Sequence, residues 1–281
     1  MNRSRHLLLA LVATVALVAA ACGDDDVVDG AATTTTSEVA DASTTTAAPE
    51  PLTILVTNDD GIGSAGIDAV VTALSAMDDV ELVIVAPAEN QSGSSDTTTP
   101  EGVPSAPGAT ASGVEGTAVS GFPADSVLVA LDELGVDPDL VVSGVNQGQN
   151  VGPLAAISGT VGAARTAIRR GVPAVAASAG LSEDTDFEAG AALVVAWITE
   201  HRAAIADGSI GADAVVSFNV PECTAGEIGD LVAVPLASEI PEGVNPFETD
   251  CSVDPADVGP VDDVDAISQG YATETLVPAE L

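Results

Sequence analysis

The sequence predicts an α/β protein in which helices cover both faces of a mainly parallel sheet. Short β-branched apolar runs alternate along the chain with segments whose apolar residues recur at helical spacing. Strands that are buried on both faces appear as continuous apolar runs, and these runs have that character. Alternation of this kind is typical of parallel sheets built from β-α-β units.

The predicted elements follow in order. Residues 52–57 form a β-branched run that stops at Asn58-Asp59-Asp60-Gly61, which indicates a buried strand ending in a sharp turn. A helix at 66–77 and a strand at 81–86 come next, before a polar loop rich in Ser, Thr, Gly and Pro that extends to about residue 115. The later elements are a helix at 125–134, a strand at 140–143, a helix at 159–170 ended by Gly171, a strand at 173–178, a helix at 187–205 and a strand at 214–218.

The N-terminus has the pattern of an export signal. Residues 1–21 combine a basic start, an apolar stretch and small residues directly before Cys22, which resembles a bacterial lipoprotein signal that would place a lipid on Cys22. A simple secretory signal is the alternative, and the apolar run is shorter than the ~18–20 residues of a membrane span. Residues 22–51 are Ala, Thr, Ser and acid, a composition typical of a disordered tether. We therefore expect an exported, extracytoplasmic protein anchored to the membrane only through its lipid, with one folded domain at 52–281.

The charge of the chain excludes whole classes of partner. The sequence has no Lys, and removal of the signal leaves four Arg against 43 acidic residues, a net charge of −39. Such a field repels nucleic acid and anionic lipid headgroups. An anionic substrate would also be repelled unless a metal ion neutralised the site locally.

Two cysteines remain for the folded domain. Cys223 and Cys251 would lie in an oxidising compartment, where pairing closes a loop of about 30 residues and stabilises the fold by about 3 kcal/mol. We favour a structural disulfide between them, because two isolated cysteines are a weak metal motif.

Polar residues after three of the predicted strands indicate a site. Asp59 and Asp60 follow the first strand, Ser92 follows the second, and Asn146 and Asn150 follow the strand at 140–143. Ligands of such sheets bind at the carboxyl ends of the strands, so these groups should converge at one edge. Adjacent carboxylates repel each other unless a cation joins them, and oxygen ligands of this kind suit Mg²⁺, Mn²⁺ or Ca²⁺ more than zinc.

A helix start faces the same edge in this prediction. Ser158, Gly159 and Thr160 open the helix at 159–170, where free N–H groups and the helix dipole bind anions. A metal opposite such a terminus suits metal-assisted phosphoester hydrolysis. A Ser–His–Asp triad is not expected, because His201, inside a helix, is the one histidine left after signal removal. Arg165 could hold phosphate only if it faced the site.

Four segments together resemble the SurE family of metal-dependent nucleotidases. They are Ile54-Leu-Val-Thr-Asn-Asp-Asp-Gly-Ile62, Val85-Ala-Pro-Ala-Glu-Asn-Gln-Ser-Gly93, Pro138-Asp-Leu-Val-Val-Ser-Gly-Val-Asn-Gln-Gly-Gln-Asn-Val-Gly152 and Ser158-Gly-Thr-Val-Gly-Ala-Ala164. The resemblance implies a Rossmann-like three-layer sandwich, a divalent metal (Mg or Mn) and hydrolysis of nucleoside monophosphates by metal-activated water. It also implies a homodimer or homotetramer formed through a C-terminal extension, here around residues 262–275.

The resemblance assigns roles to individual residues. Metal ligands would fall on Asp59, Asp60, Ser92 and Asn146, with one of the two aspartates positioning or deprotonating the water. Phosphate contacts would fall on Asn150, Ser158, Gly159 and Thr160. The chain departs from the family where Ile157 replaces a common Tyr, and its six aromatic residues leave few rings to stack on a base.

Three functions are compatible with these residues. The first is a 5′/3′-nucleotidase, and the second is a broad-specificity acid phosphatase or exopolyphosphatase with little preference for a base. The third is a catalytically weakened lipoprotein that binds a metal or a phosphorylated ligand. Retention of all four expected metal ligands favours the two enzymes.

Overall fold

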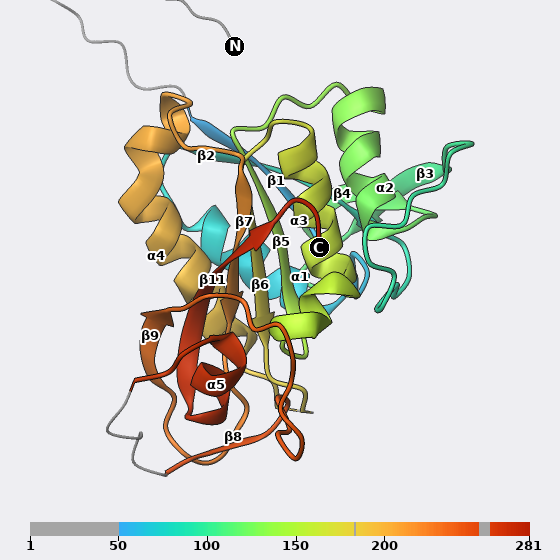
Figure 1. Cartoon of the computed structure of the whole chain (residues 1–281). Helices are drawn as coiled ribbons and strands as arrows, with labels where there is room; N and C mark the ends of the chain where they lie inside the picture. Colours follow the sequence, from blue (N-terminus) through green and yellow to red (C-terminus); the bar gives the residue numbers. More distant parts are fainter. Residues whose placement is uncertain (1–50, 183, 253–258) are drawn as a thin grey trace, which may run out of the picture. The chain divides into compact units, whose positions relative to one another are not determined.

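A nine-stranded, mostly parallel sheet forms the centre of the protein in the computed structural model, which describes residues 51–182, 184–252 and 259–281 (Figure 1). Its strands are β1 (Leu52–Thr57), β2 (Val80–Pro87), β3 (Ser105–Ala109), β4 (Glu115–Val119), β5 (Leu140–Gln147), β6 (Ala174–Ala179), β7 (Ala214–Asn219), β9 (Gly229–Ala233) and β11 (Tyr271–Pro278). Their order is β3-β4-β2-β1-β5-β6-β7-β11-β9. Only the pairs β3–β4 and β11–β7 of this sheet are antiparallel. The predicted signal peptide, Cys22 and nearly all of the predicted tether lie outside the described residues.

Helices cover both faces of the sheet, as the alternating pattern predicts. They are α1 (Ala65–Ser75), α2 (Pro123–Leu128), the π-helix η1 (Val129–Glu133), the 3₁₀ helix η2 (Gly152–Ala156), α3 (Gly159–Arg169), α4 (Phe187–Ala206) and α5 (Asp263–Ser268). Helices α1 and α4 pack together on one face, whereas α2 and α3 pack on the other. The α/β prediction is therefore confirmed.

Alternate residues of β1 enter the two cores. Ile54 and Val56 pack in the core beneath α1 and α4, and Leu55 between them packs beneath α2 and α3. All three are fully buried, because successive side chains of a central strand point to opposite faces. This double burial holds the carboxyl end of β1, where the acidic turn begins, in a fixed position.

Several element boundaries differ from the prediction. The predicted polar loop contains β3, whose Ser-Ala-Pro-Gly-Ala sequence has no apolar alternation and which lies at the edge of the sheet. The predicted helix at 125–134 begins earlier, at Pro123, and changes to π-helical geometry at Val129. The strand predicted at 140–143 continues to Gln147, which places Asn146 within β5 instead of after it.

The C-terminal segment forms a second small sheet and completes the main one. β8 (Cys223–Gly226) pairs in parallel with β10 (Thr249–Cys251), and a disulfide joins Cys223 to Cys251 with their Cα atoms 5.4 Å apart. The predicted oligomerisation extension, residues 262–275, forms α5 and the first part of β11, which pairs with β7 and β9. Figure 1 shows α5 and β8 at the end of the sheet where α3 begins.

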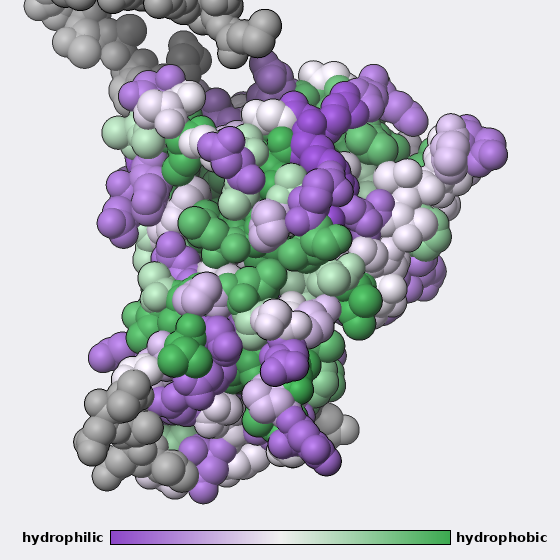
Figure 2. Space-filling model, in the orientation of Figure 1, coloured by the Kyte–Doolittle hydropathy of each residue, from purple (hydrophilic) through white to green (hydrophobic). Residues whose placement is uncertain are grey.

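Apolar residues also reach the surface. On the face shown in Figure 2, hydrophobic residues gather across the middle, between hydrophilic regions above and below. Several large apolar side chains of the described residues are exposed, among them Ile157, Leu181 and Leu276. No helix in the described ranges is both long and apolar enough to span a bilayer.

Candidate active site

The turn after β1 presents the two adjacent aspartates. Asn58 shapes this turn, because its Nδ2 donates to the Gly61 carbonyl at 3.0 Å and to Ser64 Oγ at 2.8 Å. Gly61 has φ +98°, a conformation that a residue with a Cβ rarely adopts. The Asn-Asp-Asp-Gly sequence therefore specifies a turn that holds both carboxylates at the end of the strand.

Asp59 is almost completely buried, with 2% of its surface exposed, and it contacts the start of α3. Thr160 Oγ1 donates to Asp59 Oδ1 at 2.6 Å, and a Cβ on Gly159 would lie 2.9 Å from Asp59 Oδ2. Burial raises the pKa of Asp59 to about 6; the Thr160 hydroxyl opposes this rise and the charge of Asp60 adds to it. Burial thus disfavours the charged carboxylate, and the Thr160 hydroxyl offsets part of this penalty.

Asp60 is half-buried and is held by groups from two neighbouring strand ends. Its Oδ1 accepts from Asn90 Nδ2 at 2.8 Å and from Ser92 Oγ at 3.4 Å, and its Oδ2 accepts from the Gln147 backbone N–H at 3.1 Å. Burial raises its pKa, and these hydrogen bonds lower it. The loop after β2 is also tied to the turn, since the Gln91 N–H donates to the Asp59 carbonyl at 2.7 Å.

Two asparagines reach the site from β5 and the loop that follows it. Asn146 Nδ2 donates to the Gly148 carbonyl at 2.6 Å, which leaves the amide oxygen as the atom that could bind a cation. Asn150 Nδ2 hydrogen-bonds Ser178 Oγ at 2.9 Å, and its N–H donates to Asn219 Oδ1 at 2.7 Å. Both side chains are buried, and Asn150 is held by residues of β6 and β7.

Ser158 begins α3 on the opposite side of the site. Its Oγ accepts from the Val161 N–H at 3.1 Å, which makes it the N-cap of the helix. The helix can approach the turn closely because Gly159 has no side chain; a Cβ there would lie 2.8 Å from the Cβ of Asp59. Thr160, expected to contact phosphate, hydrogen-bonds Asp59.

A cleft of about 170 Å³ brings most of the predicted residues together. Its walls are Asp59, Ser92, Gly93, Asn146, Gln147, Gly148, Gln149, Asn150, Leu154, Ile157, Ser158, Leu181 and Phe247. Asp60 lies behind Ser92, and Thr160 lies behind Asp59. Gln149, Leu154, Leu181 and Phe247 also line the cleft, although nothing in their local sequence marks them as site residues. Phe247 reaches the cleft only through the tertiary structure, because it lies 88 residues after Gly159, the first residue of α3.

The oxygen donors of the site fit a hard divalent cation. Two carboxylates, a hydroxyl and an amide oxygen (Asp59, Asp60, Ser92 and Asn146) are the ligand types that Mg²⁺ and Mn²⁺ prefer. Within the described ranges no group of three or more His, Cys, Asp or Glu side chains is arranged to bind a metal. A metal here would therefore depend on the neutral Ser92 and Asn146 oxygens in addition to the aspartates.

The arginines of the described residues are engaged outside the cleft. Arg165 is buried, donates Nε to the Ala279 carbonyl at 2.9 Å and pairs with Asp96 at 3.5 Å. Arg169 also pairs with Asp96, Arg170 pairs with Asp132, and Arg202 donates to the Asp79 carbonyl. Arg165 thus does not meet the condition for a phosphate-binding role. None of the four arginines lines the cleft.

Comparison with known proteins connects this arrangement to one family. Residues 54–240 match the family model described as survival protein SurE. The 5′-nucleotidase SurE of Halobacterium salinarum is 40% identical over 191 residues, which cover 66% of this chain and 70% of that protein. The 5′-nucleotidase SurE of Methylococcus capsulatus is 31% identical over 239 residues, 81% of this chain and 92% of that protein.

The fold shows the same relationship. The crystal structure of the SurE protein from Aquifex aeolicus superposes with a TM-score of 0.65 at 26% sequence identity. The superposition covers 82% of this chain and 94% of that one.

Proposed function

The chain belongs to the SurE family of phosphoric monoester hydrolases, and from this premise we propose that it is a metal-dependent phosphomonoesterase acting on nucleoside monophosphates. The observation that carries the proposal is the position of Asp59. Its buried carboxylate lines a cleft that none of the described arginines lines, and the adjacent charge of Asp60 raises its pKa. An anionic substrate can approach such a site when a cation offsets the two negative charges.

Asp59, Asp60, Ser92 and Asn146 would hold the metal in this proposal. A divalent cation bound there supplies positive charge, which makes water more acidic at neutral pH and neutralises phosphoryl oxygens. Asp60 is positioned by three hydrogen-bond donors and Asp59 by Thr160, so both carboxylates are held in place before any ligand binds.

The start of α3 would orient the phosphoryl group. An N-terminal helix dipole favours anions, and Ser158 at this terminus lines the cleft with Asn150. Asn150 is fixed by Ser178 and Asn219, so its amide could position substrate without reorganisation. Either aspartate could accept a proton from water, since burial raises the pKa of both carboxyl groups.

Phosphatase assays test this proposal. Purified protein supplied with Mg²⁺ or Mn²⁺ should hydrolyse AMP faster than an aryl phosphate or polyphosphate. Equal rates on AMP and the aryl phosphate would instead favour the broad-specificity phosphatase, and absence of metal-dependent turnover on every substrate would contradict both enzymes.

We also propose that the protein is exported and lipidated at Cys22 and that it forms a homodimer or homotetramer. The export signal in the sequence supports the first proposal, as does the Cys223–Cys251 disulfide, because such bonds persist in oxidising compartments. Metabolic labelling with a fatty acid should mark the wild-type protein and not Cys22→Ala. Sedimentation of the purified protein should give a mass two or four times that of one chain.

A further inference from the structure

Part of the cleft lining is apolar, and the proposed metal and phosphate site leaves this part without a role. Its side chains are Leu154, Ile157, Leu181 and Phe247. Ile157 and Leu181 are 57% and 51% exposed, so a ligand can reach them. Asp59, Ser92 and Asn146 line the same cleft. A ligand that fills the whole cleft therefore meets both polar and apolar side chains.

Phe247 provides the only aromatic ring among the cleft residues. It is half-buried and lies outside residues 54–240, the part that matches the family model. It therefore belongs to the C-terminal region, beyond the part of the chain that the family model covers.

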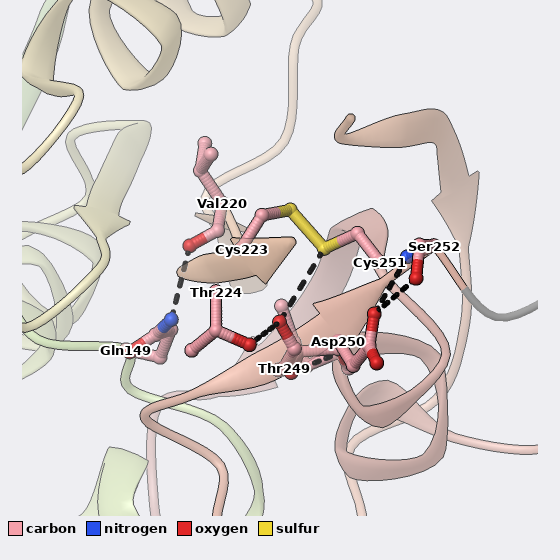
Figure 3. The surroundings of a disulfide bond; sticks show 9 residues. Gln149, Val220, Cys223, Thr224, Thr249, Asp250, Cys251 and Ser252 are labelled. Atoms are coloured by element: carbon pink, nitrogen blue, oxygen red, sulfur yellow. Dashed lines mark hydrogen bonds between the residues drawn. A yellow bond between two sulfur atoms is a disulfide. The ribbon is translucent and has the colours of Figure 1, made fainter. Parts of the chain in front are cut away.

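The segment that carries Phe247 is tied down immediately after it. Thr249, two residues later, donates its N–H to the Glu222 carbonyl at 2.7 Å and its Oγ1 to the Ile267 carbonyl at 3.0 Å. Cys251 then forms the disulfide with Cys223 (Figure 3). The disulfide and β10 thus fix the chain on one side of Phe247.

The same segment is connected to the cleft loop that follows β5. Gln149, which lines the cleft, donates Nε2 to the Val220 carbonyl at 3.2 Å, three residues before Cys223, as Figure 3 shows. Val151 packs with Val264 and Ile267 of α5 in a small separate core. Contacts from both sides therefore hold the disulfide-bonded segment against the site.

We propose that Phe247 determines specificity for a nucleobase by stacking on the base of a bound nucleotide, and that the Cys223–Cys251 disulfide positions this ring. The proposal rests on the proposed function and deepens it, because it makes the apolar part of the cleft lining the binding site of the base. Stacking suits a Phe ring because every base presents a π-face, so the site would distinguish nucleotides from phosphates without a base more strongly than one base from another.

Paired substrates isolate the base. AMP and ribose 5-phosphate share the phosphate and the sugar, so the ratio of their kcat/KM values measures what the base contributes. Removal of a stacked ring reduces binding about ten-fold, and we expect Phe247→Ala to reduce this ratio by about that factor. Phe247→Tyr keeps the ring and should keep the ratio. Leu276→Ala, which removes an exposed apolar side chain of β11 outside the cleft, is the matched control and should change neither rate.

The positioning role of the disulfide has its own test. In the double variant Cys223→Ser/Cys251→Ser, the ratio of kcat/KM for AMP to kcat/KM for ribose 5-phosphate should fall, because KM for AMP rises. Phe247→Ala added to this double variant should then cause a smaller further reduction than it causes in the wild type, because both changes act on one contact. A ratio that is unchanged in the double variant would overturn the positioning role.

Binding can also be measured on the wild-type protein, so that this test does not require a variant to fold. In saturation-transfer NMR with adenosine, we expect stronger transfer to the adenine protons than to the ribose protons. Equal or absent transfer to adenine, or an unchanged ratio in Phe247→Ala, would overturn the proposal for Phe247. Failure of the proposed function would look different, since neither AMP nor ribose 5-phosphate would then be hydrolysed with Mg²⁺ or Mn²⁺.

Discussion

Thr160 donates its hydroxyl to the carboxylate of Asp59 at 2.6 Å and so joins the start of α3 to the end of β1. The bond is buried and links residues 101 positions apart. It lowers the pKa of a carboxyl that burial would otherwise raise further. Metal binding needs the deprotonated carboxylate, so this contact should help metal bind at lower pH.

Thr160→Val should therefore weaken metal binding most at low pH. Loss of the hydroxyl raises the Asp59 pKa above its present value of about 6, so less of the carboxylate is charged at pH 6. We expect Mn²⁺ affinity to fall several-fold at pH 6 and less at pH 8, as measured by calorimetry. Thr166→Val is the control, because that hydroxyl bonds the Gly162 carbonyl in the same helix. Equal losses at both pH values would contradict the role given to Thr160.

Asp59 should also destabilise the metal-free protein at neutral pH. Its folded-state pKa, about 6, exceeds the ordinary value of 3.8 for an aspartate, so the stability that the protonated form contributes is present below pH 3.8 and lost as pH rises through 6. A shift of this size corresponds to about 3 kcal/mol. In urea unfolding with a chelator present, Asp59→Asn should be more stable than the wild type at pH 8 and nearly equal to it at pH 4. A variant less stable than the wild type at pH 8 would refute this.

Close packing of α3 against the loop after β2 should make Gly162 sensitive to substitution. A Cβ on Gly162 would lie 2.1 Å from the Ser95 carbonyl oxygen, and this backbone must then move. We expect Gly162→Ala to lower the free energy of unfolding by about 1–3 kcal/mol, the usual range for overpacking. Gly63→Ala, with no atom within 4 Å of its added Cβ, should change it little. If Gly162→Ala left the free energy of unfolding unchanged, the loop after β2 would not pack against α3 as described.

Arg165 should matter for folding and not for substrate binding. It is buried and bonds Asp96 and the Ala279 carbonyl, so Arg165→Met removes one buried partner from each and leaves only Arg169 to bond them. We expect a lower Tm and, at temperatures where the variant remains folded, an unchanged KM for AMP. A KM raised ten-fold or more would show instead that Arg165 reaches the phosphate.

Much of the fold was predictable because its signals are local. β1 is a continuous apolar run that ends in a turn sequence, and the N-cap Ser158 and the stop at Gly171 mark both ends of α3. The family prediction is confirmed for the same reason, since its motifs lie in these segments. By contrast, β3 has few apolar residues, and its pairing with β4 provides the order that its own sequence does not indicate.

The site was predictable only in part. Residues next to strand ends, such as Asp60 and Asn146, follow from topology. Topology does not predict the bond between Thr160 and Asp59, nor the position of Phe247 in the cleft. Each of these brings together residues far apart in the sequence, and their distance in space depends on the whole fold. The scarcity of aromatic residues suggested few rings for a base, yet the structure places one of them in the cleft wall.

Metal dependence of AMP hydrolysis in Asp60→Asn and wild-type protein is the most direct test of the central proposal. Chelator-treated wild-type protein should be inactive and should recover hydrolysis as Mg²⁺ or Mn²⁺ is added. Asp60→Asn should keep the fold, as judged by circular dichroism, and lose most of the recovered activity at the same metal concentration. Undiminished hydrolysis by the chelator-treated protein, or by Asp60→Asn, would contradict a metal site at these two aspartates.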